Sequence, residues 1–101
     1  MQLQKIPSDT DFLPWTLAVL LKNKKDIQKK LFNQLLVKGI EVRKGFYSAN
    51  RLKIFNTMGL KKTIKISDFL SKNIICLPFY YKMNRKQVRY ISCVFNKLIQ
   101  N

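Results

Sequence analysis

The stretch SDFLSKNIICLPFYYKMNRKQVRYISCVFNKL, residues 67–98, decides the fold of this chain because it holds three elements in close succession. A short helix is predicted first, and Asp68 suits the positive N-terminal end of that helix. The apolar run 74–77 has the length of a buried strand, and Pro78 ends it. A long helix over 84–100 is predicted to follow.

Several signals agree on where this long helix begins. Asn84 is a good N-cap, and Gln87 stands three residues later, as in a capping box. Met83 and Val88 occupy the two positions of a hydrophobic staple. One apolar stripe at helical spacing follows, formed by Val88, Ile91, Phe95, Leu98 and Ile99.

A second amphipathic helix lies upstream, in DIQKKLFNQLLVKGIEVRKGFY, residues 26–47. Its apolar face is formed by Ile27, Leu31, Leu35 and Leu36, and its lysines occupy the other faces. Lys38 suits the negative C-terminal end, and Gly39 stands where a left-handed C-cap residue belongs. The chain is predicted to leave this helix as a short strand over 40–43.

Together these segments resemble the DegT/DnrJ/EryC1/StrS aminotransferases, and among them the perosamine-synthase-like members. In that family a helix ends in Gly-Ile, and a strand, an arginine and an aromatic pair follow. Further on, a short helix leads to a Leu-Pro strand end and to a final helix. The matching residues are Gly39-Ile40, Arg43, Phe46-Tyr47, Ser67–Lys72, Leu77-Pro78 and Asn84–Ile99. The family commonly has proline after the arginine, where this chain has Lys44.

The resemblance implies the C-terminal small domain of a fold-type I aminotransferase, an enzyme that uses pyridoxal phosphate to aminate nucleotide-linked keto sugars. Such enzymes serve polysaccharide or deoxyamino-sugar biosynthesis in the cytoplasm. The Schiff-base lysine motif and the other cofactor contacts belong to the family's large domain. We therefore expect a truncated or separately encoded small domain that binds no cofactor and is inactive alone. Its expected partner is a separately encoded large domain.

Arg43, Phe46 and Tyr47 are the candidate substrate-binding residues. In the family, the segment after the Gly-Ile strand faces the active-site mouth, and an arginine can bind a carboxylate or phosphate with two hydrogen bonds. The other interpretation is a surface arginine beside aromatic side chains that pack on the small domain.

Length and periodicity predict a single small α+β domain over residues 12–101, after a loose lead-in over residues 1–11. Two long helices are expected to cover one face of a small sheet. The expected elements are a strand over 12–21, a helix over 24–38 with Asn23 as N-cap, a strand over 40–43, a short helix over 50–57, a helical turn over 67–72, a strand over 73–77 and the helix over 84–100.

Composition argues against catalysis by this chain alone. There is no histidine and there are only five acidic residues, so general acid–base groups are scarce. Cys76 and Cys93 both fall on apolar faces and are expected to be buried free thiols, with a disulfide as the alternative. A structural zinc site is not expected from two separated cysteines without histidine.

The formal net charge of +15 allows two interpretations. One is a polyanionic partner, such as nucleic acid or an acidic membrane, which makes a small basic nucleic-acid-binding protein the alternative function. The other is a solvated lysine surface. Lysine outnumbers arginine sixteen to four, whereas base readout favours arginine. We therefore expect weak, non-specific, salt-sensitive binding to polyanions.

The longest apolar run, residues 12–21, is interrupted by Pro14 and is far shorter than the roughly 20 residues that span a bilayer. No transmembrane segment is predicted. A signal peptide also fits poorly, because Asp9 and Asp11 precede the run and a basic segment follows it.

Overall fold

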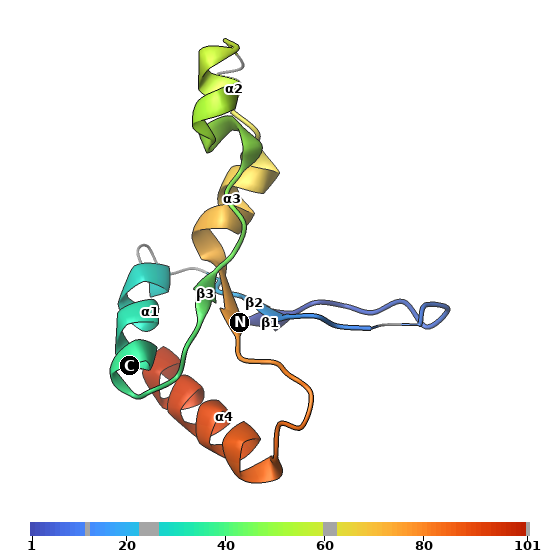
Figure 1. The fold of residues 1–101 in the computed structure, drawn as a ribbon, viewed down its shortest axis with the longest axis vertical. Coiled ribbons are helices and arrows are strands. Elements are labelled where there is room, and N and C mark those ends of the chain that lie inside the picture. The colour runs from blue at the N-terminus through green and yellow to red at the C-terminus, as the bar shows by residue number, and fades with distance from the viewer. Residues whose placement is uncertain (12, 23–26, 60–62, 101) are drawn as a thin grey trace.

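The computed structural model describes residues 1–11, 13–22, 27–59 and 63–100. Within these residues the chain forms a four-stranded sheet of order β1-β2-β4-β3, with every neighbouring pair antiparallel, and four α-helices (Figure 1). The elements in chain order are β1 (Gln2–Leu3), β2 (Leu17–Leu20), α1 (Ile27–Val37), β3 (Arg43–Lys44), the 3-10 turn η1 (Ala49–Arg51), α2 (Lys53–Thr57), α3 (Lys65–Asn73), β4 (Ile74–Leu77) and α4 (Arg85–Gln100). The predicted α+β class is confirmed.

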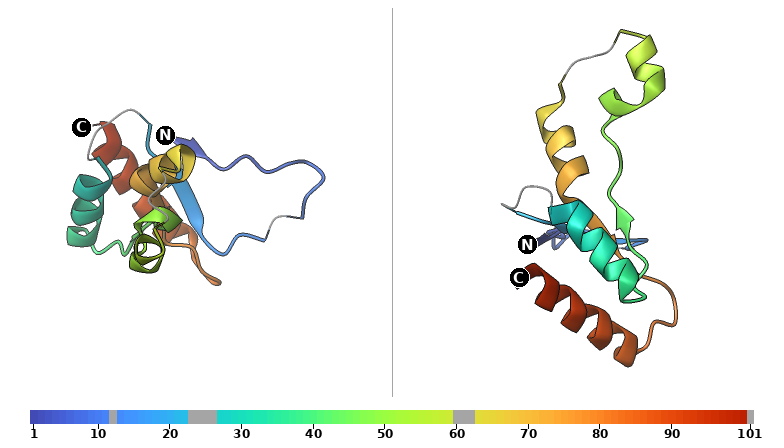
Figure 2. Two further views of the ribbon diagram at one scale, coloured as in Figure 1. Left: turned by 90° about the horizontal axis from the view of Figure 1, so that it is seen from above. Right: turned by 90° about the vertical axis from the view of Figure 1, so that its left-hand side faces the viewer.

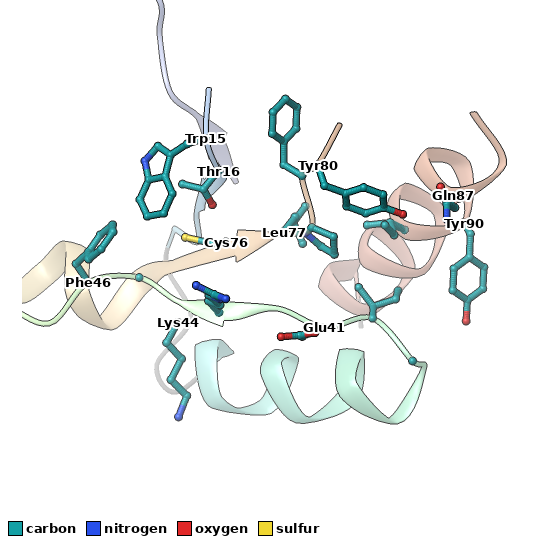
Figure 3. Close-up of a pocket in the computed structure, with 17 residues that line it drawn as sticks. Trp15, Thr16, Glu41, Lys44, Phe46, Cys76, Leu77, Tyr80, Gln87 and Tyr90 are labelled. Carbon is teal, nitrogen blue, oxygen red and sulfur yellow. The ribbon is translucent and has the colours of Figure 1, made fainter. Parts of the chain in front are cut away.

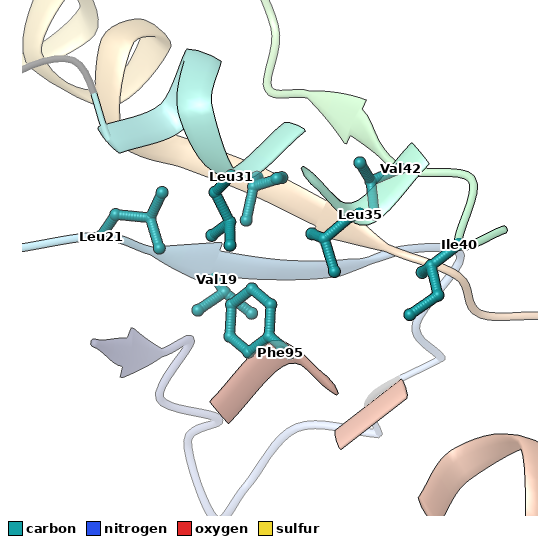
Figure 4. Packing of buried hydrophobic residues seen from close by; sticks show 8 residues of the cluster. Val19, Leu21, Leu31, Leu35, Ile40, Val42 and Phe95 are labelled. Atoms are coloured by element: carbon teal, nitrogen blue, oxygen red, sulfur yellow. The ribbon is translucent and has the colours of Figure 1, made fainter. Parts of the chain in front are cut away.

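The hydrophobic core lies between one face of the sheet and helices α1 and α4 (Figure 4). Val19 of β2 and Ile75 of β4 are register partners, so their side chains lie on the same face. The other buried members of the cluster are Leu21, Leu31, Leu35, Ile40, Val42 and Phe95. The two long helices therefore cover one sheet face, as their apolar stripes predicted.

Helix α4 begins with the predicted capping box. The Gln87 backbone N–H donates to Asn84 Oδ1 at 2.9 Å, and the Asn84 N–H donates to Gln87 Oε1 at 2.9 Å. Two backbone donors that the helix cannot satisfy are thus bonded by side chains.

Helix α1 ends in a Schellman motif, which confirms Gly39 as its left-handed residue, with φ of 71°. The Ile40 N–H donates to the Leu35 carbonyl at 2.9 Å, and the Gly39 N–H donates to the Leu36 carbonyl at 2.9 Å. Ile40 and Leu35 are also both buried in the core. At the other end of this helix, the predicted N-cap Asn23 lies outside the described residues.

The strand expected over 12–21 is found only at Leu17–Leu20, and Leu36, expected on the apolar face of α1, is 43% exposed. Four further details of the prediction are wrong. The strand expected at 40–43 is found at Arg43–Lys44, because Ile40 is used in the helix cap and the chain meets β4 only at Arg43. Val88 is 47% exposed, since the start of α4 lies away from the sheet. Cys93 is exposed, although both cysteines are free as expected. Its position two residues after Ile91 puts it on the far side of the helix.

The fourth difference concerns the segment expected as a loose lead-in over residues 1–11. Gln2 and Leu3 pair with Leu20 and Val19, which adds β1 to the sheet. Residues 4–11 and 13–16, between β1 and β2, run out from the body (Figure 1). The sequence could not predict this pairing, because a strand of only two residues is too short to show an alternation of polar and apolar residues.

The end of the molecule formed by η1, α2 and α3 projects away from α1 and α4 (Figure 2). Polar contacts join η1 to α3 in this part of the molecule. Buried Ser48 donates to Asn50 Oδ1 at 2.5 Å, the Asn50 amide donates to Asp68 Oδ2 at 3.1 Å, and Arg51 Nε lies 3.5 Å from Asp68 Oδ1. The hydrogen bond from Asn50 is the main cause that lowers the pKa of Asp68 below its usual range.

Candidate functional site

Two of the three predicted substrate residues, Arg43 and Phe46, line the same cavity of about 580 Å³ (Figure 3). The third, Tyr47, is 72% exposed and does not line it. The cavity runs from the residues just before β2 across β3 and β4 to the first turns of α4. Its other lining residues include Trp15, Thr16, Glu41, Lys44, Gly45, Cys76, Leu77, Pro78, Phe79, Tyr80, Gln87 and Tyr90.

Strand register places Arg43 in this cavity. Arg43 is paired with Cys76, whereas the next residue, Lys44, is paired with Ile75 of the core. Because neighbouring side chains of a strand point to opposite faces, Arg43 lies on the sheet face opposite the core. Cys76, on that same face, also lines the cavity.

The two cations at this strand therefore have different surroundings. The Lys44 ammonium lies 4.9 Å from the ring centroid of Phe32 on α1 and points away from the cavity (Figure 3). Arg43 has no carboxylate within ion-pair distance among the described residues, although Glu41 lines the same cavity. Its guanidinium is thus available for an anionic group of a ligand.

An aromatic pair forms one wall of the cavity. The Trp15 and Phe46 ring centroids lie 5.8 Å apart, with 38° between the ring planes (Figure 3). The two residues are 71% and 72% exposed, so the pair presents apolar surface beside Arg43. The sequence interpretation placed Trp15 at the start of a buried strand and missed this role. The only sequence feature that could have indicated this role was an aromatic residue next to Pro14.

The opposite wall is set by the start of α4. The Tyr90 hydroxyl donates to the Lys38 carbonyl at 2.8 Å, which joins α4 to the end of α1 below the cavity. Tyr80 lines this cavity and also a neighbouring one of about 670 Å³, which Tyr81 helps to line. Tyr80 thus borders both cavities and Tyr81 only the second, and both residues are exposed.

Neither a metal site nor a membrane span is found in the described part of the chain. Residues 1–11, 13–22, 27–59 and 63–100 contain no group of three or more side chains that could hold a metal ion. Among these same residues, no helix has the length and apolar character needed to cross a bilayer.

The sequence model of the DegT/DnrJ/EryC1/StrS aminotransferase family matches residues 1–95 of this 101-residue chain. Among curated proteins, none matches the chain. The family match covers β1 to β4 and most of α4, and it therefore includes every residue of the cavity described above.

Proposed function

The chain belongs to the DegT/DnrJ/EryC1/StrS aminotransferase family, and we propose that it acts as the small domain of a pyridoxal-phosphate-dependent nucleotide-sugar aminotransferase. In this role it contributes to polysaccharide or deoxyamino-sugar biosynthesis. The two free cysteines accord with a reducing, cytoplasmic setting. Residues 1–101 are inactive alone and work with a large domain that supplies the cofactor site.

The single observation that carries the substrate assignment is the free guanidinium of Arg43 beside exposed aromatic rings. Arg43 suits a phosphate or carboxylate, and the Trp15–Phe46 pair suits a planar base or a sugar face. A nucleotide-linked sugar presents both kinds of group. We propose that Arg43 binds the anionic part of such a substrate and that Phe46 makes apolar contacts with it. Tyr47 lies at the outer margin of the site.

The residues present do not fit pyridoxal phosphate itself. The cofactor needs a lysine amine, a carboxylate opposite its ring nitrogen and donors for its phosphate. Among the described residues that line the cavity Lys44 is the only lysine, and it turns its amine towards Phe32 instead. Gly39, which lines the cavity, is already used to end α1 and forms no glycine-rich phosphate loop. Cofactor chemistry is therefore assigned to the large domain.

We expect the purified chain, incubated with pyridoxal phosphate and an amino donor, to show no stoichiometric imine absorption and no transamination. Exposed lysines give only weak, scattered imines, because none of them combines with phosphate and ring-nitrogen contacts. Absorption spectra recorded over a cofactor titration test this. A one-to-one adduct that disappears when a single lysine is changed to alanine contradicts the proposal.

The substrate assignment is tested by substituting Arg43. Titration of the full chain with UDP and with GDP, followed by heteronuclear NMR shifts, should show weak binding centred on the cavity. The Arg43→Ala change should weaken this binding about tenfold, because it removes a charge-assisted contact to the diphosphate.

Arg89→Ala is the matched control, since it removes the same charge from an exposed position of α4 outside the cavity. It should leave the affinity nearly unchanged. Equal loss in the two variants would mean that only the overall charge attracts the nucleotide. The net charge of +15 predicts weak binding to polyanions by overall charge attraction of this sort, and this stays a prediction.

A further inference from the structure

Gln28 of α1 bonds with its side chain to the point where α3 runs into β4. Helix α3 ends at Asn73 and β4 begins at Ile74, so no loop separates the two elements (Figure 1). The Gln28 Nε2 group donates to the Ser71 carbonyl at 3.1 Å and to the Ile74 carbonyl at 2.5 Å. Because a glutamine amide carries two N–H donors, this one side chain can satisfy both carbonyls.

These bonds hold the C-terminal end of α3. The last carbonyls of a helix have no partner within the helix, so they need donors from elsewhere. In α3, Gln28 supplies the donor for Ser71, and the Leu21 N–H donates to the Asn73 carbonyl at 2.8 Å. Gln28 is half-buried, so a lost donor there is not freely replaced by water. The direction in which α3 leaves the sheet therefore depends on Gln28.

The Ile74 carbonyl connects Gln28 to the cavity. It also accepts a hydrogen bond from the Gly45 N–H at 3.1 Å, and its two lone pairs allow both bonds. Gly45 directly follows β3, and Arg43, Gly45 and Phe46 all line the cavity. Gln28 itself does not line the cavity, so it can act on the cavity only through other residues.

We propose that Gln28 is a positioning residue for the cavity. By holding the α3–β4 junction it keeps Gly45 bonded to Ile74, and it thereby fixes where Arg43 and Phe46 lie. Such an anchor matters because β3 is an edge strand of only two residues, which few ladder bonds hold in place. The use of the cavity for a nucleotide-linked sugar rests on the proposed function, whereas the positioning itself does not.

Two substitutions remove the donors and keep about the same side-chain length. Gln28→Met has no polar group, and Gln28→Glu has the shape of glutamine but only accepts hydrogen bonds when it is ionised. A carboxylate also suits the first turn of α1, so the helix itself is not weakened. Gln34→Met and Gln34→Glu are the matched controls, since Gln34 is half-buried on the same helix but lies about 9 Å further along its axis.

Two NMR signals report on the cavity without any ligand. Hydrogen exchange of the Gly45 N–H should be about tenfold faster in both Gln28 variants, after correction for global unfolding measured on the core amides. Trp15 is the single tryptophan of the chain, and its ring centroid lies 5.8 Å from that of Phe46. Its indole N–H signal should therefore move towards the position that it takes in Phe46→Ala. The Gln34 variants should keep both signals as in the parent chain.

Several results would overturn the proposal. One is Gly45 exchange that rises only in step with global unfolding, and another is a Trp15 signal that stays at its parent position. Equal effects in the Gln28 and Gln34 variants would show a general response of α1. A Gln28→Glu variant that behaves like the parent would show that the donors do not matter.

Titration with UDP and GDP adds the link to the proposed function. The Gln28 variants should bind either nucleotide about threefold more weakly than the parent chain, because Arg43 and Phe46 are less well placed. Affinity equal to that of the parent would overturn the positioning role. A parent chain that binds neither nucleotide would remove the substrate assignment instead, and the two ligand-free signals would still decide the role of Gln28.

Discussion

Replacing Phe95 with alanine should lower the free energy of unfolding by about 3–5 kcal/mol, the largest single effect expected in this chain. Phe95 is 3% exposed and is the buried residue through which α4 contributes to the core cluster. Its loss opens a cavity between α4 and the sheet, which the surrounding side chains fill only in part. Total stabilities of native domains are about 5–15 kcal/mol, so this loss removes a large share of the stability of the domain.

Cys93→Ala is the matched control, because it shortens a side chain two residues away on the same helix. Cys93 is exposed, so its loss should change stability by less than about 0.5 kcal/mol. Urea denaturation followed by circular dichroism measures both variants. If Cys93 were buried, as the sequence led us to expect, its replacement would carry a cost as well. A large loss at Cys93, or a small one at Phe95, would contradict the packing described here.

Replacing Gly45 with alanine should cost about 2–3 kcal/mol, because the side of β3 that faces β4 has no room for a side chain. A Cβ atom added at Gly45 would lie 2.9 Å from both Cβ and Cγ2 of Ile74. The Gly45 N–H also donates to the Ile74 carbonyl at 3.1 Å, so the two strands cannot separate without losing this bond. The same shift would displace Arg43 and Phe46, which line the cavity on either side of Gly45.

A double-mutant cycle identifies the cause. In an Ile74→Gly background both the Cβ and the Cγ2 contact are gone, so Gly45→Ala should cost clearly less than in the parent chain. Denaturant unfolding of the four proteins gives the coupling energy. Additive costs would mean that Gly45 is required for some reason other than close approach to Ile74. The same variants, titrated with nucleotide, should show weaker binding wherever the strand is displaced.

The functional assignment rests on evidence of two kinds. Order and spacing of short motifs pointed to the aminotransferase family, and the family match over residues 1–95 confirms it. Substrate binding by Arg43, Phe46 and Tyr47 stays a prediction. Arg43 and Phe46 lie together in one cavity, but Tyr47 does not line it, and Trp15 was not foreseen as the partner of Phe46. The family resemblance located the segment, whereas strand register decides which of its side chains share a face.

The sequence alone determined the features that depend on residues close to one another along the chain. The capping box at Asn84 and the Schellman motif at Gly39 involve hydrogen bonds between residues only a few positions apart, so residue type predicts them. The apolar stripes predicted the helices for the same reason, since their period follows from helical geometry.

Only the tertiary structure decided the features that depend on pairing between distant segments. The register of Arg43 with Cys76 turns the guanidinium away from the core, and a shift of one residue would exchange it with Lys44. The requirement for glycine at position 45 comes from Ile74, twenty-nine positions later in the chain (74 − 45). The exposure of α2 and α3 likewise depends on where α1 and α4 pack. Residue types along the chain do not indicate which distant segments come together, because these contacts exist only after the sheet has formed.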